Sequence, residues 1–241
     1  MLQALRAEVQ ALASPERAKN NAWFFKTGPG QYGEGDQFAG LTLTQIRGLV
    51  RKYRDLSIED CETLLHSTLH EERLIALLIL VQRYRARKTD GATRKRIYDL
   101  YLANTAYVNN WDLVDASAVH IVGPYLADKP KDVLFRLAAS DLVWDRRIAV
   151  LATFHYIKQG DSALALQIAA ALMSDKHDLI HKATGWMLRE VDKRCGHKTL
   201  TAFLDTHAVT MPRTALRYAL ERFPPEERAH YMSLKQRSRT S

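Results

Sequence analysis

Cysteine is scarce in this chain: 241 residues contain two, Cys61 and Cys195, which lie in separate segments without the spacing of metal ligands. This scarcity argues against a disulfide framework and against a zinc site, so we expect reduced thiols, no bound metal and no cofactor. Long apolar runs are also missing. No segment approaches the roughly 20 apolar residues of a membrane helix, and the first residues lack the apolar core of a signal peptide. We therefore expect a cytoplasmic protein that does not bind membranes.

Patterns of β-strands are lacking too, because strict alternation of apolar and polar residues never extends far, whereas the 3.6-residue helical period recurs almost everywhere. Short breaks such as Gly91 and Gly160-Asp161 divide the chain into helical segments. The second helix of each successive pair begins about every 30 to 40 residues, as in two-helix solenoid repeats. We place these starts near His70, Trp111, Val143, Asp178 and Pro212. The sequence predicts an all-α fold, an α-α superhelix (solenoid).

The expected organisation is a single domain over residues 1–241. It comprises N-terminal helices and a glycine-rich loop in 1–56, stacked helical pairs in 57–234, and a basic tail in 235–241. The segments TLTQ at 42–45 and SIED at 57–60 resemble capping boxes, in which a hydroxyl and a side chain three residues later bind each other's backbone N–H. Helices should therefore start after Thr42 and after Ser57.

Residues 28–33, GPGQYG, match the GxGxxG pattern of dinucleotide-binding folds. That pattern has meaning only between a buried strand and the helix that the loop opens. No β-branched run precedes it here, and Glu34 and Asp36 would place two carboxylates beside an anionic phosphate. We therefore do not interpret this loop as a nucleotide site.

The net charge is +8, which is typical of nucleic-acid-binding proteins. Cations are densest in the segment 83–96, RYRARKTDGATRKR. For any single one of them, a solvated helix junction explains the charge as well as a phosphate contact does. The cluster as a whole favours phosphate, and the concave face of a helical stack would let basic residues follow a DNA backbone. These cations are Arg83, Arg85, Arg87, Lys88, Arg94, Lys95 and Arg96.

Helical phasing assigns different environments to two of the four tryptophans. Trp144 shares a stripe with Ile148 and Leu151, which predicts a place in the core. Trp186 lies opposite the apolar stripe of its own helix, so we interpret it as facing a ligand, with packing against the next repeat as the alternative. The cations in line with Trp186 are Lys182, Arg189 and Lys193.

The segment WDLVDAS at 111–117 places Trp111 and Asp115 one turn apart on the same helix face. Asp112 lies in the first turn, where a carboxylate complements the helix N-terminus, so we interpret it as a cap. Asp115 is beyond the free N–H groups of that end and calls for another explanation. Arg147 flanks a core stripe and is interpreted as projecting toward a phosphate, although spacing alone does not fix its direction.

Two histidine pairs have the i, i+4 spacing of metal ligands: His66 with His70, and His177 with His181. No third ligand of suitable type accompanies either pair, and the segment HSTLHEER lacks the internal glutamate of a metalloprotease helix. We therefore predict no metal at either pair.

Five segments, in order along nearly the whole chain, resemble the AlkD-like DNA alkylation repair family, which are DNA glycosylases built of HEAT-like repeats. They are FFKTGPGQYGEGDQFAG, NNWDLVDAS, WDRRIAV, GWMLREV and MPRTALRYALERFP. The resemblance implies that the glycine-rich loop is a connection into the helix after Thr42. It also implies that Tyr32 supplies an aromatic contact to the lesion. The residues implied to line the lesion site are Trp111, Asp115, Arg147 and Trp186.

The resulting hypothesis is a monomeric DNA-3-methyladenine/7-methylguanine glycosylase that hydrolyses the N-glycosidic bond of cationic 3- and 7-alkylated purines in double-stranded DNA. Asp115 would be the catalytic carboxylate, Trp111 and Trp186 would face the cationic base, and the basic residues would hold the backbone. One alternative is a non-catalytic helical-repeat DNA-binding protein, which leaves Asp115 among phosphates that repel it. The other is a HEAT-type protein-interaction scaffold, which does not need a basic surface.

Overall fold

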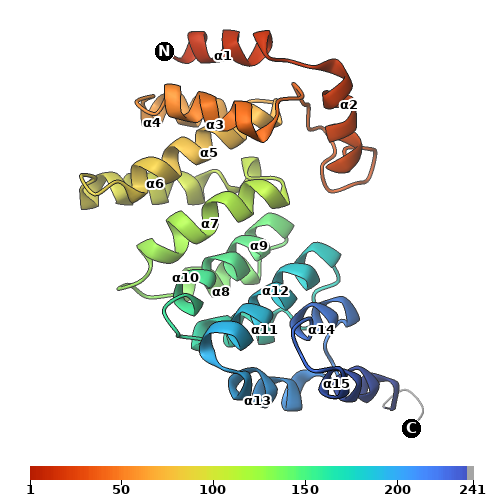
Figure 1. Cartoon of the computed structure of the whole chain (residues 1–241). Helices are drawn as coiled ribbons and strands as arrows, with labels where there is room; N and C mark the ends of the chain where they lie inside the picture. Colours follow the sequence, from red (N-terminus) through yellow and green to blue (C-terminus); the bar gives the residue numbers. More distant parts are fainter. Residues whose placement is uncertain (238–241) are drawn as a thin grey trace. The chain divides into compact units, whose positions relative to one another are not determined.

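The computed structural model describes residues 1–237, so residues 238–241 of the expected basic tail lie outside the described part of the chain. Every regular element within it is a helix, and extended pairing there is limited to an isolated parallel bridge between Gln37 and Leu69. This confirms the predicted all-α class and agrees with an α-α superhelical repeat fold (Figure 1). None of the described helices is long and apolar enough to cross a lipid bilayer.

The chain forms two compact units, Met1–Ile121 and Val122–Ser241, and the single domain over residues 1–241 stays a prediction. The first unit is drawn from red to green in Figure 1, and α7 continues past its end. Its helices are α1 (Leu2–Ala11), α2 (Pro15–Phe24), α3 (Leu43–Lys52), α4 (Ile58–Leu65), α5 (His70–Arg85), α6 (Gly91–Ala103), the 3-10 turn η1 (Thr105–Tyr107) and α7 (Trp111–Tyr125).

The second unit consists of shorter helices around the long helix α12, which contacts α9, α11, α13 and α14. All five predicted starts of second helices are confirmed, because α5, α7, α9 and α12 begin at the expected residues and Pro212 is the N-cap of α14. The helices of this unit are α8 (Asp132–Ala138), α9 (Val143–Ala152), α10 (Phe154–Ile157), α11 (Ala163–Ala171), α12 (Asp178–Cys195), α13 (His197–His207), α14 (Arg213–Ala219) and α15 (Pro225–Arg237).

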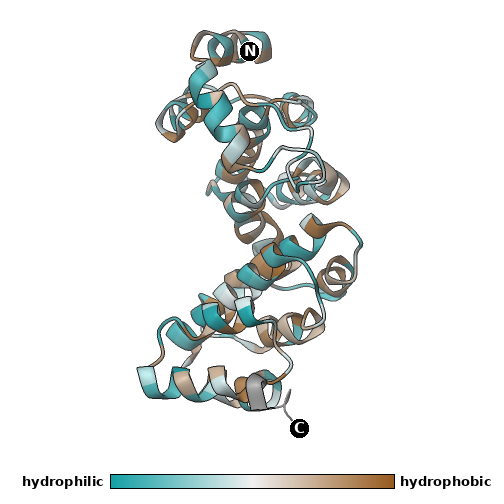
Figure 2. Cartoon of the chain, turned by 90° about the vertical axis from the view of Figure 1, so that its right-hand side faces the viewer, coloured by the Kyte–Doolittle hydropathy of each residue, from teal (hydrophilic) through white to brown (hydrophobic). Residues whose placement is uncertain are grey.

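The predicted capping signals are used at both helix starts. Thr42 forms a full capping box with Gln45 at the start of α3, and the Ser57 hydroxyl accepts the Asp60 N–H at 3.0 Å at the start of α4. Figure 2 shows hydrophilic and hydrophobic residues alternating within single helices, as expected of amphipathic helices that bury one stripe. The helix α5 differs, since its buried residues lie on all sides, against α3, α4 and α6. It is the central element of the first unit.

Gly185 allows α12 and α14 to approach closely. A Cβ added at Gly185 would lie 2.4 Å from the backbone oxygen of Ala215 and 2.5 Å from the Cβ of Tyr218. Both obstacles are fixed parts of α14, so a methyl group there would force the two helices apart.

We therefore expect Gly185→Ala to destabilise the protein by about 1 to 3 kcal/mol, the usual cost of overpacking a tight contact. Thermal or urea unfolding measures this change. Gly48→Ala is the matched control, because a Cβ at helical Gly48 meets nothing within 4 Å and should stabilise α3 slightly. Equal melting temperatures for the Gly185 variant and the wild type would contradict the close approach.

Candidate functional site

The first two turns of α7 carry Trp111, Asp112 and Asp115. Asn110 is fully buried and its Oδ1 accepts the backbone N–H of Trp111 at 2.9 Å. Asp112 accepts instead a hydrogen bond at its Oδ2 from Nε2 of His70, at 2.9 Å. The interpretation of Asp112 as a cap is therefore corrected: Asn110 binds the free N–H, and the Asp112 carboxylate is turned toward α5.

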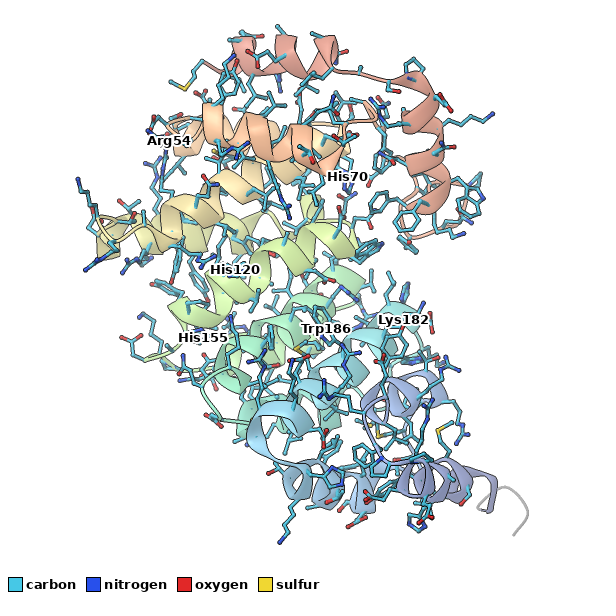
Figure 3. All side chains as sticks on the ribbon, viewed as in Figure 1. Arg54, His70, His120, His155, Lys182 and Trp186 are labelled. Carbon is cyan, nitrogen blue, oxygen red and sulfur yellow. The ribbon has the colours of Figure 1, made fainter. Side chains whose placement is uncertain are left out.

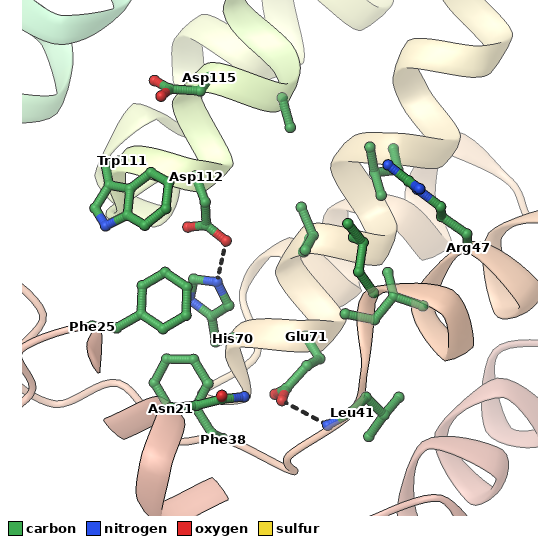
Figure 4. Close-up of a pocket in the computed structure, with 15 residues that line it drawn as sticks. Asn21, Phe25, Phe38, Leu41, Arg47, His70, Glu71, Trp111, Asp112 and Asp115 are labelled. Carbon is green, nitrogen blue, oxygen red and sulfur yellow. Dashed lines mark hydrogen bonds and ion pairs between the residues drawn. The ribbon is translucent and has the colours of Figure 1, made fainter. Parts of the chain in front are cut away.

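Trp111 and Asp115 border a cavity of about 510 Å³ that lies within the first unit (Figure 4). Phe25 and Phe38 form its aromatic wall together with Trp111, and the carboxylates of Asp112 and Asp115 both line it. Trp111 and Asp115 are each half-buried. The predicted pair is thus on one face of α7, at a concave surface that combines π systems with negative charge, which suits a flat cationic ligand.

The aromatic side chains of this wall form a continuous stack. The ring centroid of Phe25 lies 5.5 Å from that of Trp111 at an interplanar angle of 25°, and 5.2 Å from that of Phe38 at 14°. Phe24 adds an edge-on contact to Trp111 at 6.0 Å. Sequence reasoning missed both Phe25 and Phe38. A signal for both was present, because they lie in the segment FFKTGPGQYGEGDQFAG that resembles the family, but this segment was interpreted only as a connection into α3.

A buried charged network lies beneath this wall. His70 is 2% exposed, with Nδ1 3.4 Å from Asp36 and Nε2 2.9 Å from Asp112. Burial alone would lower the pKa of His70, but the hydrogen bonds to Asp112 and Asp36 outweigh it and raise the pKa above its usual value. The pKa of Asp36 is lowered, since bonds to His70, Arg73 and Asn109 outweigh the opposing effect of its own burial. Both shifts favour the charged forms of these two groups.

The glycine-rich segment is held by Glu71, which is 2% exposed. Its carboxylate accepts backbone N–H bonds from Ala39 at 2.9 Å, Gly40 at 2.8 Å and Leu41 at 3.2 Å. Gly40 has a φ of +82°, and a Cβ there would lie 2.3 Å from the oxygen of Ser14, so only glycine fits. This segment leads into α3 as predicted, and it closes one side of the cavity.

The GxGxxG pattern at 28–33 does not have the context of a dinucleotide site, because helix α2 rather than a strand precedes it. Gly33 approaches the backbone instead, since a Cβ there would lie 2.4 Å from the oxygen of Phe25. Tyr32 is partly buried and is not among the described residues that line the 510 Å³ cavity. Its contact with a lesion stays a prediction.

The predicted phasing of α12 is confirmed in the second unit, where Ala183 and Met187 are buried and Trp186 is half-buried. The side chains of Trp186 and Lys182 are labelled in Figure 3. Trp186 lies 6.2 Å from Phe154, over whose ring Lys158 and Arg194 are placed at 5.1 and 5.4 Å. Phe154 was missed by the sequence analysis because it belongs to the four-residue helix α10.

Two of the three cations in line with Trp186 already have carboxylate partners. Lys182 pairs with Asp178 at 2.7 Å, and Arg189 pairs with Glu221, whereas Lys193 is exposed. Such exposed pairs are worth less than about 1 kcal/mol and are screened by salt, so a phosphate can compete for the cation. Contact of this stripe with a DNA backbone stays a prediction.

Arg147 does not have the open position that was expected of it. It is 5% exposed, and its Nη1 donates to the backbone oxygen of Leu179 at 2.7 Å, which links α9 to α12. The neighbouring Arg146 pairs with Asp175 at 2.6 Å. The expected projection from the helix edge is therefore corrected, because the guanidinium is turned into the protein. Trp144, on the same helix, is 4% exposed and belongs to the core as predicted.

Much of the basic cluster at 83–96 is bound by the protein itself. Arg83 donates to the Leu56 oxygen at 2.5 Å, Arg94 to the Tyr84 oxygen at 3.2 Å, and Arg96 pairs with Glu59. For these residues a helix-junction role is sufficient. Arg85, Arg87 and Lys88 are exposed.

A second hollow, of about 360 Å³, adjoins the cavity on the same unit, with Arg47 and Ala116 lining both. It is bordered by exposed cations from two helices, Arg47 and Arg51 of α3 and Arg85 of α5, and by His120 of α7. This basic surface runs directly from the cavity that contains Trp111 and Asp115. It was not predicted, because Arg47 and Arg51 are distant in sequence from the dense cluster.

The histidine pairs have other partners than a metal. His66 Nε2 lies 2.6 Å from the Oδ1 of Asn104, His177 accepts the Leu179 N–H at 3.2 Å, and His181 contacts the Asp175 oxygen at 2.6 Å. Over the described residues, no group of three histidine, cysteine or acidic side chains is placed to hold a metal ion.

Comparison with known proteins gives a consistent result. A family model described as "DNA alkylation repair enzyme" matches residues 5–223. A solved structure from Enterococcus faecalis, described as a predicted DNA alkylation repair enzyme, superimposes with a TM-score of 0.69 at 18% sequence identity. The match covers 88% of this chain and 97% of that one, and at this identity it shows a shared fold. No curated protein sequence matches the chain significantly.

Proposed function

The chain belongs to the DNA alkylation repair enzyme family, which supports a role in DNA repair, and from this premise we propose that it is a DNA glycosylase. It hydrolyses the N-glycosidic bond of purines that carry an alkyl group at position 3 or 7 in double-stranded DNA. Its partner is duplex DNA with alkylated bases, where it acts as a monomer without a cofactor. Because its substrate is DNA, we place it in the cytoplasm with the chromosome.

The observation that carries the proposal is that Trp111 and Asp115 both line the 510 Å³ cavity. A purine alkylated at position 3 or 7 is cationic, so its glycosidic bond is weakened and the base leaves as a neutral molecule. A carboxylate and an aromatic face therefore meet the needs of the reaction without a separate acid. The aromatic stack behind Trp111 fixes the orientation of that face.

In the proposed reaction the bond between C1′ and the base nitrogen breaks, and its electron pair stays with the base. The deoxyribose acquires oxocarbenium character, which the negative charge of Asp115 stabilises. A water molecule adds to C1′ and releases its proton to solvent. Trp111 contributes a cation–π interaction of about 0.5 to 2 kcal/mol, depending on how far the base is desolvated.

The second unit contributes Trp186, which we propose also faces the alkylated base, together with the exposed Lys193 and the ion-paired Lys182 and Arg189 along the DNA backbone. Tyr32 is proposed as a further contact to the lesion. For Arg147 we propose a supporting part, in which its bond to Leu179 fixes the start of α12 and hence the helix that carries Trp186.

Binding to DNA should depend strongly on salt if these cations contact phosphates. We expect the logarithm of the association constant to fall linearly with the logarithm of salt concentration, with little dependence on sequence. Replacing Arg47, Arg51 and Arg85 by alanine should reduce the slope by about 3, one unit per lost phosphate contact. The measurement is fluorescence anisotropy with a labelled duplex. Replacing Arg83 and Arg94 by alanine is the control, because their side chains donate to backbone oxygens of the protein.

The deciding experiment for the proposed function is release of free base. The protein is incubated with a duplex methylated by a methylating agent, and the supernatant is analysed for 7-methylguanine and 3-methyladenine. Salt-dependent binding without release would favour a non-catalytic DNA-binding protein. Affinity for DNA that does not change with salt would favour a protein-interaction scaffold.

A further inference from the structure

Four consecutive charged or titratable residues at the start of α5, His70 to Arg73, are at most 3% exposed. Burying such groups is costly unless each is paired. Glu71 holds the backbone of residues 39–41, and Glu72 pairs with Arg6 at 3.3 Å. Arg73 pairs with Asp36 at 2.7 Å. The fourth, His70, is the one that reaches α7.

His70 is confined on every side. Its ring stacks on Phe38 at 4.7 Å and lies 4.9 Å from Phe25, the ring on which Trp111 stacks. Its two nitrogens contact carboxylates of different elements, Asp36 of the glycine-rich segment and Asp112 of α7. Figure 4 shows this imidazole directly below the first turn of α7, with the bond to Asp112 dashed.

The bond between His70 and Asp112 is the principal restraint on this carboxylate. Oδ1 of Asp112 is buried and has no hydrogen-bond partner among the described residues, so the carboxylate is held at Oδ2, by His70. Asp112 is bonded to Trp111 in the chain and lies three residues before Asp115. A side chain that fixes Asp112 therefore fixes the start of the helix from which both proposed site residues project.

We propose that His70 is a positioning residue of the excision reaction, which orients Trp111 and Asp115 through Asp112 and through the ring of Phe25. The expected effect of His70 on the excision rate rests on the proposed function. The expected effect of His70 on the position of Trp111 does not, and it can be measured without any activity. Besides lining the cavity, His70 of α5 connects the glycine-rich segment, through Asp36, with α7, through Asp112.

If His70 had a purely structural role, we would expect a different result from its replacement. Phenylalanine would continue the stack of rings, but it leaves the Asp112 carboxylate without its partner, which lowers stability without by itself changing the reaction of the folded protein. If His70 only filled space, His70→Phe would leave the reaction unchanged. If it positions α7, the variant folds and yet reacts slowly.

Protonation supplies a second distinction. The charged groups that face His70 are Asp36 of the loop, Asp112 of α7 and Arg73 of its own helix, and the neighbouring Glu71 is engaged with the backbone. Hydrogen bonds to the two carboxylates outweigh the effect of burial and keep the pKa of His70 raised, which favours the imidazolium. As pH rises through that pKa, the imidazolium loses its proton and one of its two bonds to carboxylate.

The first test observes Trp111 directly by 19F NMR of the full chain with 5-fluorotryptophan at its four tryptophans, the Trp111 signal being assigned with Trp111→Phe. In the wild type the Trp111 signal should shift with pH, with a midpoint above the ordinary histidine value. In His70→Phe that titration should vanish, while the Trp144 signal stays unchanged. A Trp111 signal that does not respond to pH, or that titrates equally in His70→Phe, overturns the inference.

The second test compares single-turnover excision with binding. His70→Phe should lower the rate constant about 10- to 100-fold, the usual effect of a small misplacement of reacting groups, with the dissociation constant for unmodified duplex unchanged. His70→Gln keeps one donor toward Asp112 and should recover part of the rate. His66→Phe, a histidine exchange near Asn104, is the control and should react like the wild type.

The outcomes separate the two proposals. Excision by wild type and by both His70 variants at equal rates overturns the positioning role and leaves the glycosylase standing. Absence of excision by the wild type overturns the glycosylase, and the 19F titration then decides whether His70 holds Trp111. If His70→Phe does not fold, the Gln variant decides by rate and by titration.

Discussion

Asp115→Asn is expected to slow the release of 7-methylguanine and 3-methyladenine by about 100-fold, the lower end of what one preorganised electrostatic contact supplies. The lower end is expected because a cationic base already leaves readily without assistance. Asparagine retains the size of aspartate and much of its hydrogen bonding, so the negative charge is the property removed. Asp115 is half-buried at the cavity, where this charge is incompletely screened.

The fold and the affinity for DNA should survive this change. Binding should become slightly tighter, because a carboxylate near phosphates is repulsive. Single-turnover kinetics with wild type and variant on the same methylated duplex measure the rate, and circular dichroism checks the helical content. Wild-type rates in Asp115→Asn would remove this carboxylate from the mechanism.

A neutral lesion is the matched control on the substrate side. Uracil offers no cation to Trp111 or Trp186 and must leave as an anion, so the wild type should release it poorly. Efficient release of uracil would contradict the argument from a cationic leaving group.

Trp144→Ala is expected to destabilise the protein by about 3 to 5 kcal/mol, the usual cost of truncating a large core side chain. Trp144 is 4% exposed on α9, where Ile148 and Leu151 are also buried. The cavity left behind would remove contacts with them. The melting temperature and the urea midpoint measure the loss.

Trp186→Ala is the paired variant, because the two tryptophans have the same size and different environments. Trp186 is half-buried, with Phe154 6.2 Å away. Its loss should change the melting temperature little and reduce excision. Reversed outcomes for the two variants would show that the ring of Trp186 is a packing element.

The helical architecture could be predicted because it depends on local signals. The starts of α5, α7, α9 and α12 follow from periodicity and breaks, and the cap at Thr42 follows from a four-residue pattern. Phasing within α12 correctly separated Met187 from Trp186, because one face of a helix is decided by neighbours three and four residues away.

The cavity itself could not be predicted, because its wall is assembled from residues distant in sequence. Phe25 and Phe38 come from a connection, His70 from α5 and Trp111 from α7, and no periodic pattern relates them. Asp112 was misinterpreted for the same reason: position alone suggested a cap, and its partner is 42 residues earlier in the chain. Arg147 was assigned to a phosphate because its hydrogen-bond acceptor, the backbone oxygen of Leu179, belongs to another helix and cannot be found from the spacing within α9.

The segment around Gly40 turns out to be an anion-binding nest whose anion is part of the protein. Successive backbone N–H groups of residues 39–41 converge on one carboxylate, in the manner of phosphate-binding loops. The Glu71 carboxylate fills this nest, so a DNA phosphate is excluded from it. The same hydrogen bonds hold the segment that follows the N-terminal helices against α5. Glycine at this point is thus required for closure of the chain on itself rather than for recognition of a nucleotide.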